Sequence, residues 1–216
     1  MSTANAPAGG EILRPRRRPA QARSRERFSR ILTAARGVLV ESGFESFTFD
    51  EVAKRADVPI GTIYQFFANK YAMVCELDRE DTNATVAALR SFSEQVPTPQ
   101  WPVVLEDFID HLAELWVRDP SRRAVWHAVQ STPATRATAA DTEREMLDLI
   151  AGVLGPLAHG VPRTERRKLA GVLVHTVVSL LNYAVGAPER TDADVDAVVA
   201  ETKRMLVAYL FTVAGA

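Results

Sequence analysis

The fold of this chain is decided by one stretch, residues 31–73, which reads ILTAARGVLVESGFESFTFDEVAKRADVPIGTIYQFFANKYAM. From Phe28 onward, apolar residues recur at spacings of three and four, and this periodicity predicts a first amphipathic helix. Gly43 suits the end of that helix, because glycine readily takes the left-handed conformation that commonly follows a last turn. The stretch therefore opens with a helix.

Two shorter helices are predicted directly after it. Thr48 and Glu51 have the Thr-x-x-Glu spacing of a capping box, which indicates a helix start. Asp57-Val58-Pro59 ends that helix, and Pro59 suits the first turn of a third helix over residues 60–67. Three helices in this layout predict a helix-turn-helix, a pattern that also produces many false matches when taken alone.

The rest of the chain predicts helices as well. Apolar residues keep the helical spacing through 164–186 and 191–213, and no stretch alternates as a strand would. We expect an all-α protein of about nine helices. The expected parts are a disordered basic arm (1–27), a three-helix domain (28–72) and a larger helical domain (73–216).

Charge is distributed unevenly along the chain. Residues 1–70 carry a net charge of about +5 and residues 71–216 about −6, although the whole chain is close to neutral at −1. A basic end on an acidic body suggests that one end meets a polyanion. Within the arm, four arginines either form a solvated tail or contact DNA: Arg14, Arg16, Arg17 and Arg18.

Several classes of protein are not expected. A single cysteine, Cys75, cannot form an internal disulfide, which favours a reducing cytoplasm. The start has no secretory signal pattern, and the most apolar stretch, 171–187, is too short to span a bilayer comfortably, so no membrane partner is expected. The four histidines lack metal-ligand spacing, and no phosphate-binding loop or nucleophile elbow occurs. We therefore expect no metal, no cofactor and no enzyme activity.

Residues 31–73 closely resemble the DNA-binding domain of the TetR-type (tetracycline-repressor-like) regulators. The resemblance is carried by the tail Gly61-Thr62-x-Tyr64-x-x-Phe67-x-x-Lys70 and by earlier marks in the stretch: Ala34, Ala35, Gly43, Phe44, Thr48, Val52, Ala53 and Val58. The chain departs from the family pattern with Asp57 where glycine is usual and Pro59 where serine or threonine is common. Both departures concern only the turn.

The resemblance implies a set of DNA-contacting residues, and their chemistry agrees. Tyr64 and Lys70 are expected to hold phosphates, while Thr62 and Gln65 are placed to read base edges. Gly61 would allow close approach of the backbone. Ile60 is expected to add an apolar contact. Thr48 either only caps its helix or also contacts a phosphate. Phe66 either faces DNA or packs inward with Ile63.

The same resemblance implies that the C-terminal domain binds a small-molecule effector and forms a homodimer through residues 164–186 and 191–213. Aromatic and histidine side chains cluster after residue 100, where they either line a pocket or fill the core: Trp101, Phe108, His111, Trp116, Trp126 and His127. Taken together, the sequence predicts a cytoplasmic, ligand-responsive transcriptional regulator, most often a repressor in this family, on pseudo-palindromic operator DNA. The alternatives are a helical ligand-binding or interaction protein without DNA binding and, more remotely, an enzyme.

Overall fold

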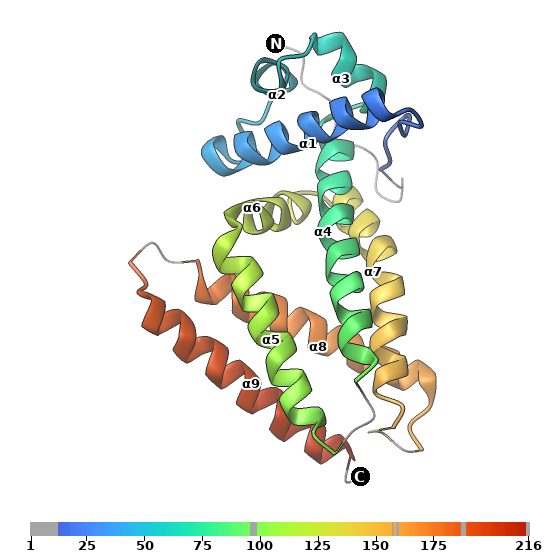
Figure 1. Cartoon of the computed structure of the whole chain (residues 1–216), viewed down its shortest axis with the longest axis vertical. Coiled ribbons are helices and arrows are strands. Elements are labelled where there is room, and N and C mark those ends of the chain that lie inside the picture. The colour runs from blue at the N-terminus through green and yellow to red at the C-terminus, as the bar shows by residue number, and fades with distance from the viewer. Residues whose placement is uncertain (1–12, 96–98, 157, 159, 187–188, 215–216) are drawn as a thin grey trace. The chain divides into compact units, whose positions relative to one another are not determined.

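A computed structural model of the chain describes residues 13–95, 99–156, 158, 160–186 and 189–214. Across these residues the chain forms nine helices and no strand (Figure 1), so the predicted all-α class is confirmed. The helices are α1 (Ala22–Ser42), α2 (Phe49–Ala56), α3 (Ile60–Phe66), α4 (Lys70–Ser93), α5 (Trp101–Arg118), α6 (Pro120–Val129), α7 (Pro133–Val153), α8 (Arg163–Ala184) and α9 (Asp192–Ala214).

The chain packs as two compact units, each built from two separate segments of sequence. The first comprises the chain up to residue 82 together with 120–142, and the second comprises 83–119 and 143–216. The expected boundary after residue 72 is therefore not a packing boundary. The reason is that α6, which lies far along the sequence, packs against α1, and local periodicity does not reveal such a long-range contact.

The core of the first unit forms on the inner face of α1. Ile31, Ala35 and Leu39 are buried there at helical spacing, as the sequence predicts. Val52 from α2 and Ile63 from α3 close over them, and both are fully buried. Apolar residues from α4 and α6 complete this cluster. The helix-turn-helix is thus anchored to α1 by side-chain packing.

The expected disorder of residues 1–27 is wrong for the part of that segment that the structure describes, residues 13–27. Helix α1 begins at Ala22. Its first turns carry mostly exposed polar side chains, so they show no apolar periodicity in the sequence. Residues 13–20, called the strap below, precede it without regular structure. Leu13 is only 7% exposed and belongs to the core of the first unit, so the strap is packed and not a solvated tail.

A half-buried arginine joins three helices of the first unit. The Arg36 guanidinium on α1 donates to the Asp81 carboxylate on α4 at 2.8 Å and to Ser121 Oγ on α6 at 3.2 Å. It also donates to the backbone oxygen of Leu77 at 3.3 Å. Hydrogen bonds that involve charged groups are stronger than neutral ones, so Arg36 fixes the spacing of α1, α4 and α6.

The two ends of α2 are set by Thr48 and Asp57, the first of them as the capping-box spacing predicts. The Thr48 side chain accepts a hydrogen bond from the Glu51 backbone N–H at 3.3 Å and caps α2. Asp57 takes the left-handed conformation, with φ 51° and ψ 56°. Asp57 is the one described residue other than glycine with positive φ, which explains why glycine is usual here.

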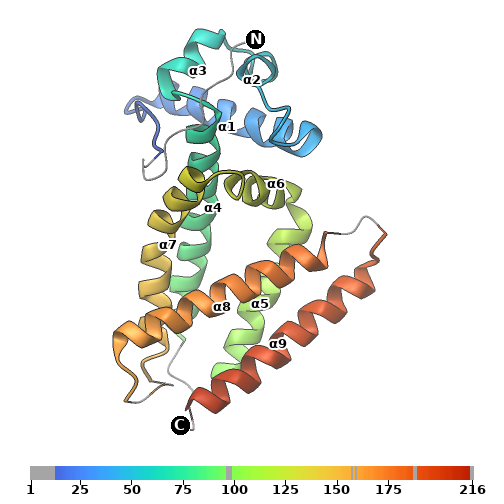
Figure 2. The same ribbon diagram turned by 180° about the vertical axis from the view of Figure 1, so that it is seen from behind.

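In the second unit, α5, α8 and α9 pack together, and Figure 2 shows α5 passing behind α8. Ile109, Leu181 and Leu206 form the buried centre of this group. A separate cluster joins α4 to α7 through Val86 and Met146. None of the helices in the described ranges has the length and apolar content needed to cross a bilayer.

The strain at Asp57 leads to a stability prediction. Asp57→Gly should raise the free energy of unfolding by up to about 1 kcal/mol, because glycine has no Cβ to clash in the left-handed region. Asp57→Val should lower it by about 1–2 kcal/mol, since a branched side chain tolerates that region poorly. Urea unfolding followed by circular dichroism measures both changes, and equal stability of the three proteins would contradict the assigned geometry.

Candidate nucleic-acid interface

Helix α3 has an inner and an outer face that differ in burial. Ile63 and Phe66 are buried at 0% and 4% exposure. The outer positions Ile60, Gly61, Tyr64 and Gln65 are exposed, and Thr62 is half-buried between the two faces. Of the predicted base-reading pair, Gln65 is therefore on the outer face and Thr62 is at its edge.

The structure resolves the two alternatives for Phe66 in favour of inward packing. The Phe66 ring lies edge-on against the Phe28 ring, with centroids 5.2 Å apart. The Phe67 ring stacks on the same Phe28 ring at 5.3 Å. Phe66 is therefore removed from the set of candidate DNA contacts, because apolar burial beside Phe28 and Ile63 outweighs exposure at the interface.

Tyr64 and Gly61 have surroundings that suit a binding surface. The Tyr64 ring rests edge-on against Phe49 at 5.2 Å, yet 47% of the residue stays exposed. At Gly61, an added Cβ would meet nothing within 4 Å in the chain. The space beside Gly61 is therefore open, so packing inside the chain gives no reason for glycine at this position.

Thr48 is exposed but already engaged as the cap of α2. Asp50 and Glu51 follow it in the first helical turn. Two carboxylates there oppose an incoming phosphate, although the helix N-terminus itself favours anions. The capping role of Thr48 is thus present in the structure, and phosphate binding at this helix end is electrostatically weakened.

Lys70 has a structural role that the sequence did not predict. Its ammonium donates to the backbone oxygens of Phe44 at 2.9 Å and Glu45 at 3.3 Å. It also lies 4.4 Å from the centre of the Phe44 ring, a cation–π contact. Lys70 therefore ties the first residues of α4 to the loop between α1 and α2. Backbone acceptors of this kind leave no trace in a sequence pattern.

The four arginines of the strap differ in their contacts. Arg14 pairs with Asp141 at 3.5 Å and Arg18 with Glu76 at 3.4 Å. Arg16 donates to the backbone oxygen of Tyr64 at 3.1 Å. Arg17 is exposed and forms no hydrogen bond or ion pair with another described residue. The predicted cluster is thus mostly engaged within the first unit.

The six predicted ligand-binding residues fall into two groups. Trp101, Phe108, His111 and Trp116 lie on α5 in the second unit, and Trp126 and His127 lie on α6 in the first. On α5, Phe108 packs against Phe92 at 5.0 Å, with His111 on the same ring at 6.1 Å. Trp101 packs against Phe211 of α9 at 5.0 Å. These aromatic contacts join α5 to α4 and to α9 within the second unit.

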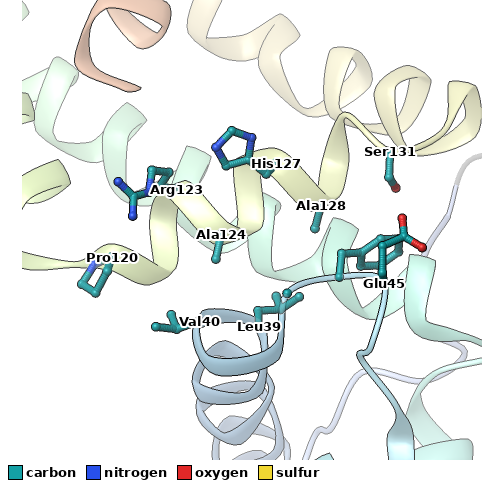
Figure 3. Close-up of a pocket in the computed structure, with 11 residues that line it drawn as sticks. Leu39, Val40, Glu45, Pro120, Arg123, Ala124, His127, Ala128 and Ser131 are labelled. Carbon is teal, nitrogen blue, oxygen red and sulfur yellow. The ribbon is translucent and has the colours of Figure 1, made fainter. Parts of the chain in front are cut away.

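A shallow pocket of about 320 Å³ lies in the first unit, where α6 passes the end of α1 (Figure 3). His127 belongs to its lining, and burial together with the neighbouring Arg123 charge lowers the pKa of this imidazole. The wall formed by α1 and the following loop could not be foreseen from the sequence. The lining residues are Leu39, Val40, Gly43, Phe44, Glu45, Pro120, Arg123, Ala124, His127, Ala128 and Ser131.

The described part of the chain offers neither a cluster of metal ligands nor an activated cysteine. No group of three or more histidine, cysteine, aspartate or glutamate side chains there could hold a metal ion. Cys75 is buried, and burial raises the pKa of its thiol to about 12. The thiolate is the reactive form of cysteine, so Cys75 is an inert core residue.

Two family models match the chain. One, described as bacterial regulatory proteins of the tetR family, matches residues 31–77 and so includes α2, the turn and α3. The other, described as a tetracyclin repressor-like C-terminal domain, matches residues 99–214, which is more than half of the chain. The chain belongs to the TetR family. The predicted family and the predicted class of function, a transcriptional regulator, are confirmed.

Similar proteins include regulators from other bacteria. The HTH-type transcriptional repressor KstR of Mycobacterium tuberculosis is 28% identical over 171 residues, which span 78% of this chain and 76% of KstR. The HTH-type regulator YdeS of Bacillus subtilis is 31% identical over 85 residues, which span 39% of this chain and only 38% of YdeS. These relatives support membership in a family of regulators and not of enzymes.

Solved structures share the fold. FadR of Bacillus subtilis, solved in complex with stearoyl-CoA, has a TM-score of 0.69 at 21% identity, and the match covers 84% of this TetR-family chain and 98% of FadR. A TetR-family regulator from Streptomyces coelicolor has a TM-score of 0.62 at 24% identity, with 87% and 99% of the two chains covered. At such identities the likeness concerns the fold.

The contacts of Lys70 predict a loss of stability on its removal. Lys70→Ala should lower the free energy of unfolding by roughly 1–3 kcal/mol, because charged hydrogen bonds to two backbone carbonyls, one of them partly buried, are lost. Lys54→Ala is the matched control, since Lys54 is exposed at the end of α2 and should change stability by less than about 1 kcal/mol. Urea unfolding of both variants tests this, and equal losses would show that the Lys70 bonds contribute nothing.

Proposed function

We propose that this TetR-family chain binds operator DNA through α3 and represses transcription until a small-molecule effector releases it. One observation carries the DNA-binding proposal. The outer face of α3 is exposed and small or polar around Gly61 and Gln65, while Ile63 and Phe66 fix the helix from beneath. A helix that is rigid on one side and open on the other suits insertion into a major groove.

The roles of individual residues follow from their chemistry. Gln65 and Thr62 read base edges, because a glutamine amide can pair with adenine and a threonine methyl can meet thymine. Ile60 adds an apolar contact. Tyr64 and Arg17 contact phosphates of the DNA backbone. Lys70 adds its positive charge near these phosphates while its ammonium stays bonded to the protein loop between α1 and α2.

Helix α3 carries no charged residue at all. Bidentate arginine or lysine contacts to guanine are therefore unavailable from this helix before Lys70, which begins α4. Operator discrimination depends instead on adenine and thymine contacts and on DNA shape. We expect operator half-sites whose α3-contacted positions are mainly A·T pairs.

Two further points support repression and release. KstR, the similar protein from Mycobacterium tuberculosis, is named as a repressor. The matched C-terminal domain is tetracyclin repressor-like.

Release by an effector follows from linkage between the two binding sites. Suppose that an effector binds best when the spacing of the two α3 helices does not fit successive major grooves. It then weakens DNA binding by the same factor by which DNA weakens binding of the effector. Stearoyl-CoA, the compound bound to FadR, is a suitable first probe for such an effector.

A homodimer through α8 and α9 is part of the proposal. Tyr183 on α8 and Met205 and Tyr209 on α9 are 60%, 42% and 45% exposed, respectively. Met205 and Tyr209 are four residues apart and so share one face of α9, and exposed apolar side chains on a shared face are typical of protein–protein contacts. In a two-fold dimer the two α3 helices must enter major grooves about 34–36 Å apart or a multiple of a turn, which requires a pseudo-palindromic operator. The proposed place of action is the cytoplasm.

The decisive experiment is selection of bound duplexes from a random pool with the purified chain. An enriched inverted repeat supports operator binding, and the genes beside its genomic copies indicate what is regulated. If no sequence is enriched while the protein is folded and dimeric, DNA recognition is contradicted, and a helical interaction protein becomes the better interpretation.

Gln65→Ala tests base reading by α3. The variant should bind the selected operator more weakly by about 1–3 kcal/mol and bind random DNA almost unchanged, because one bidentate base contact is lost. Preference should also relax at one base pair in each half-site. Fluorescence anisotropy titrations on both duplexes measure this. An equal loss on operator and random DNA would reassign Gln65 to the phosphate backbone.

Tyr209→Arg tests the homodimer. The wild type should sediment as a dimer at micromolar concentration, and Tyr209→Arg should shift it toward monomer, because a charge replaces an exposed apolar contact. Ala200→Arg is the control, since Ala200 is also exposed on α9 but lies about two and a half helical turns before Tyr209 and so on the opposite side of the helix. A monomeric wild type would remove the dimer, and dissociation by both variants would place the interface elsewhere on α9.

A further inference from the structure

The strap, residues 13–20, is fastened to two helices of the first unit. The Leu13 backbone N–H donates to Thr138 Oγ on α7 at 3.0 Å, a buried hydrogen bond. Arg14 pairs with Asp141 on the same helix. Arg18 reaches Glu76 on α4, whose side chain is 2% exposed. The strap therefore has fixed points on both sides of Arg16.

Between these points Arg16 meets the end of α3. The Arg16 backbone N–H donates to the Phe66 oxygen at 2.7 Å, and its guanidinium donates to the Tyr64 oxygen at 3.1 Å. The last carbonyls of a helix have no partners within the helix. Two of these carbonyls of α3 are thus satisfied by one residue of the strap.

Helix α3 needs such support because it is short. It has seven residues and no basic residue in its last turn. Isolated helices shorter than about 12 residues are marginal in water. The C-terminal end of α3 is also the end that carries Tyr64 and Gln65, two of the residues proposed to contact DNA.

We propose that Arg16 is a positioning residue for α3: anchored by the strap on α4 and α7, it holds the C-terminal carbonyls of α3 and so sets the orientation in which Gln65 is presented. Arg16 acts on DNA through α3 and not through a phosphate. This inference extends the proposed DNA binding, but its first test uses the protein alone.

Arg17 provides the matched control because it is the next residue and carries the same charge. It is exposed and, among the described residues, pairs with none. Arg17→Ala therefore removes a cation near the same surface without removing a bond to α3. Comparison of Arg16→Ala with Arg17→Ala separates positioning from charge.

The first test is amide hydrogen exchange of the full-length protein without DNA. The Phe67 N–H donates to the Ile63 oxygen at 2.9 Å and reports on the last turn of α3. In Arg16→Ala this amide should exchange roughly three- to tenfold faster, as expected for loss of one supporting hydrogen bond. Core amides of α1, such as Ala35, should keep their rates, and Arg17→Ala should match the wild type throughout.

The second test uses operator and random duplexes over a range of salt concentrations. Arg16→Ala should lower operator affinity roughly three- to tenfold while the salt slope stays unchanged. Arg17→Ala should weaken both duplexes and reduce the slope by about 0.9, as for loss of one phosphate contact. Arg16→Lys, which keeps a donor, should restore part of the Phe67 protection.

The inference is overturned if Phe67 exchange is unchanged in Arg16→Ala, or if α1 amides accelerate equally, which would indicate general destabilisation. It is also overturned if the salt slope falls in Arg16→Ala as it does in Arg17→Ala, because Arg16 would then be a phosphate contact. Absence of operator binding by the wild type would contradict the proposed function and leave the exchange result on Arg16 standing.

Discussion

The arrangement of the helix-turn-helix depends on the packing of α3, a helix too short to be stable on its own. Helix α3 has seven residues, and a helix of this length gains little from its own hydrogen bonds. Its position is set by Ile63 and Phe66, which pack into the core beside Phe28. Burial of two large apolar side chains stabilises by several kcal/mol in total, on the order of 1.5–3 kcal/mol for each. The outer face can therefore be small and polar without loss of order.

Cations in the first unit contribute to this arrangement by binding backbone oxygens. Lys70 donates to Phe44 and Glu45, Arg16 donates to Tyr64, and Arg36 donates to Leu77. A charged donor to a carbonyl makes a stronger bond than a neutral one. The positive charge of residues 1–70 is thus partly used to fix loops and helix ends, and only part of it faces solvent.

The sequence predicted those elements that are determined by residues close together in the chain. Apolar spacing placed α1, and residue chemistry placed the Thr48 cap, the end of α2 at Asp57 and the start of α3 after Pro59. The sequence could not predict contacts between distant segments. The strap looked disordered because Leu13 is its single anchoring apolar residue and finds its hydrogen-bond partner 125 residues later. Trp116 and Trp126 looked like one cluster, yet they belong to different units.

The strap also bears on the order in which the chain becomes functional during synthesis. A ribosome releases residues 13–73 long before Thr138 and Asp141 exist, so the N-terminal helices emerge without the partners that fasten the strap. Closing a loop of that length is slow compared with local helix formation. In a nascent chain α3 can therefore form before the strap is fastened, and the contacts of the strap with Thr138 and Asp141 become possible only after about two thirds of the protein has been made.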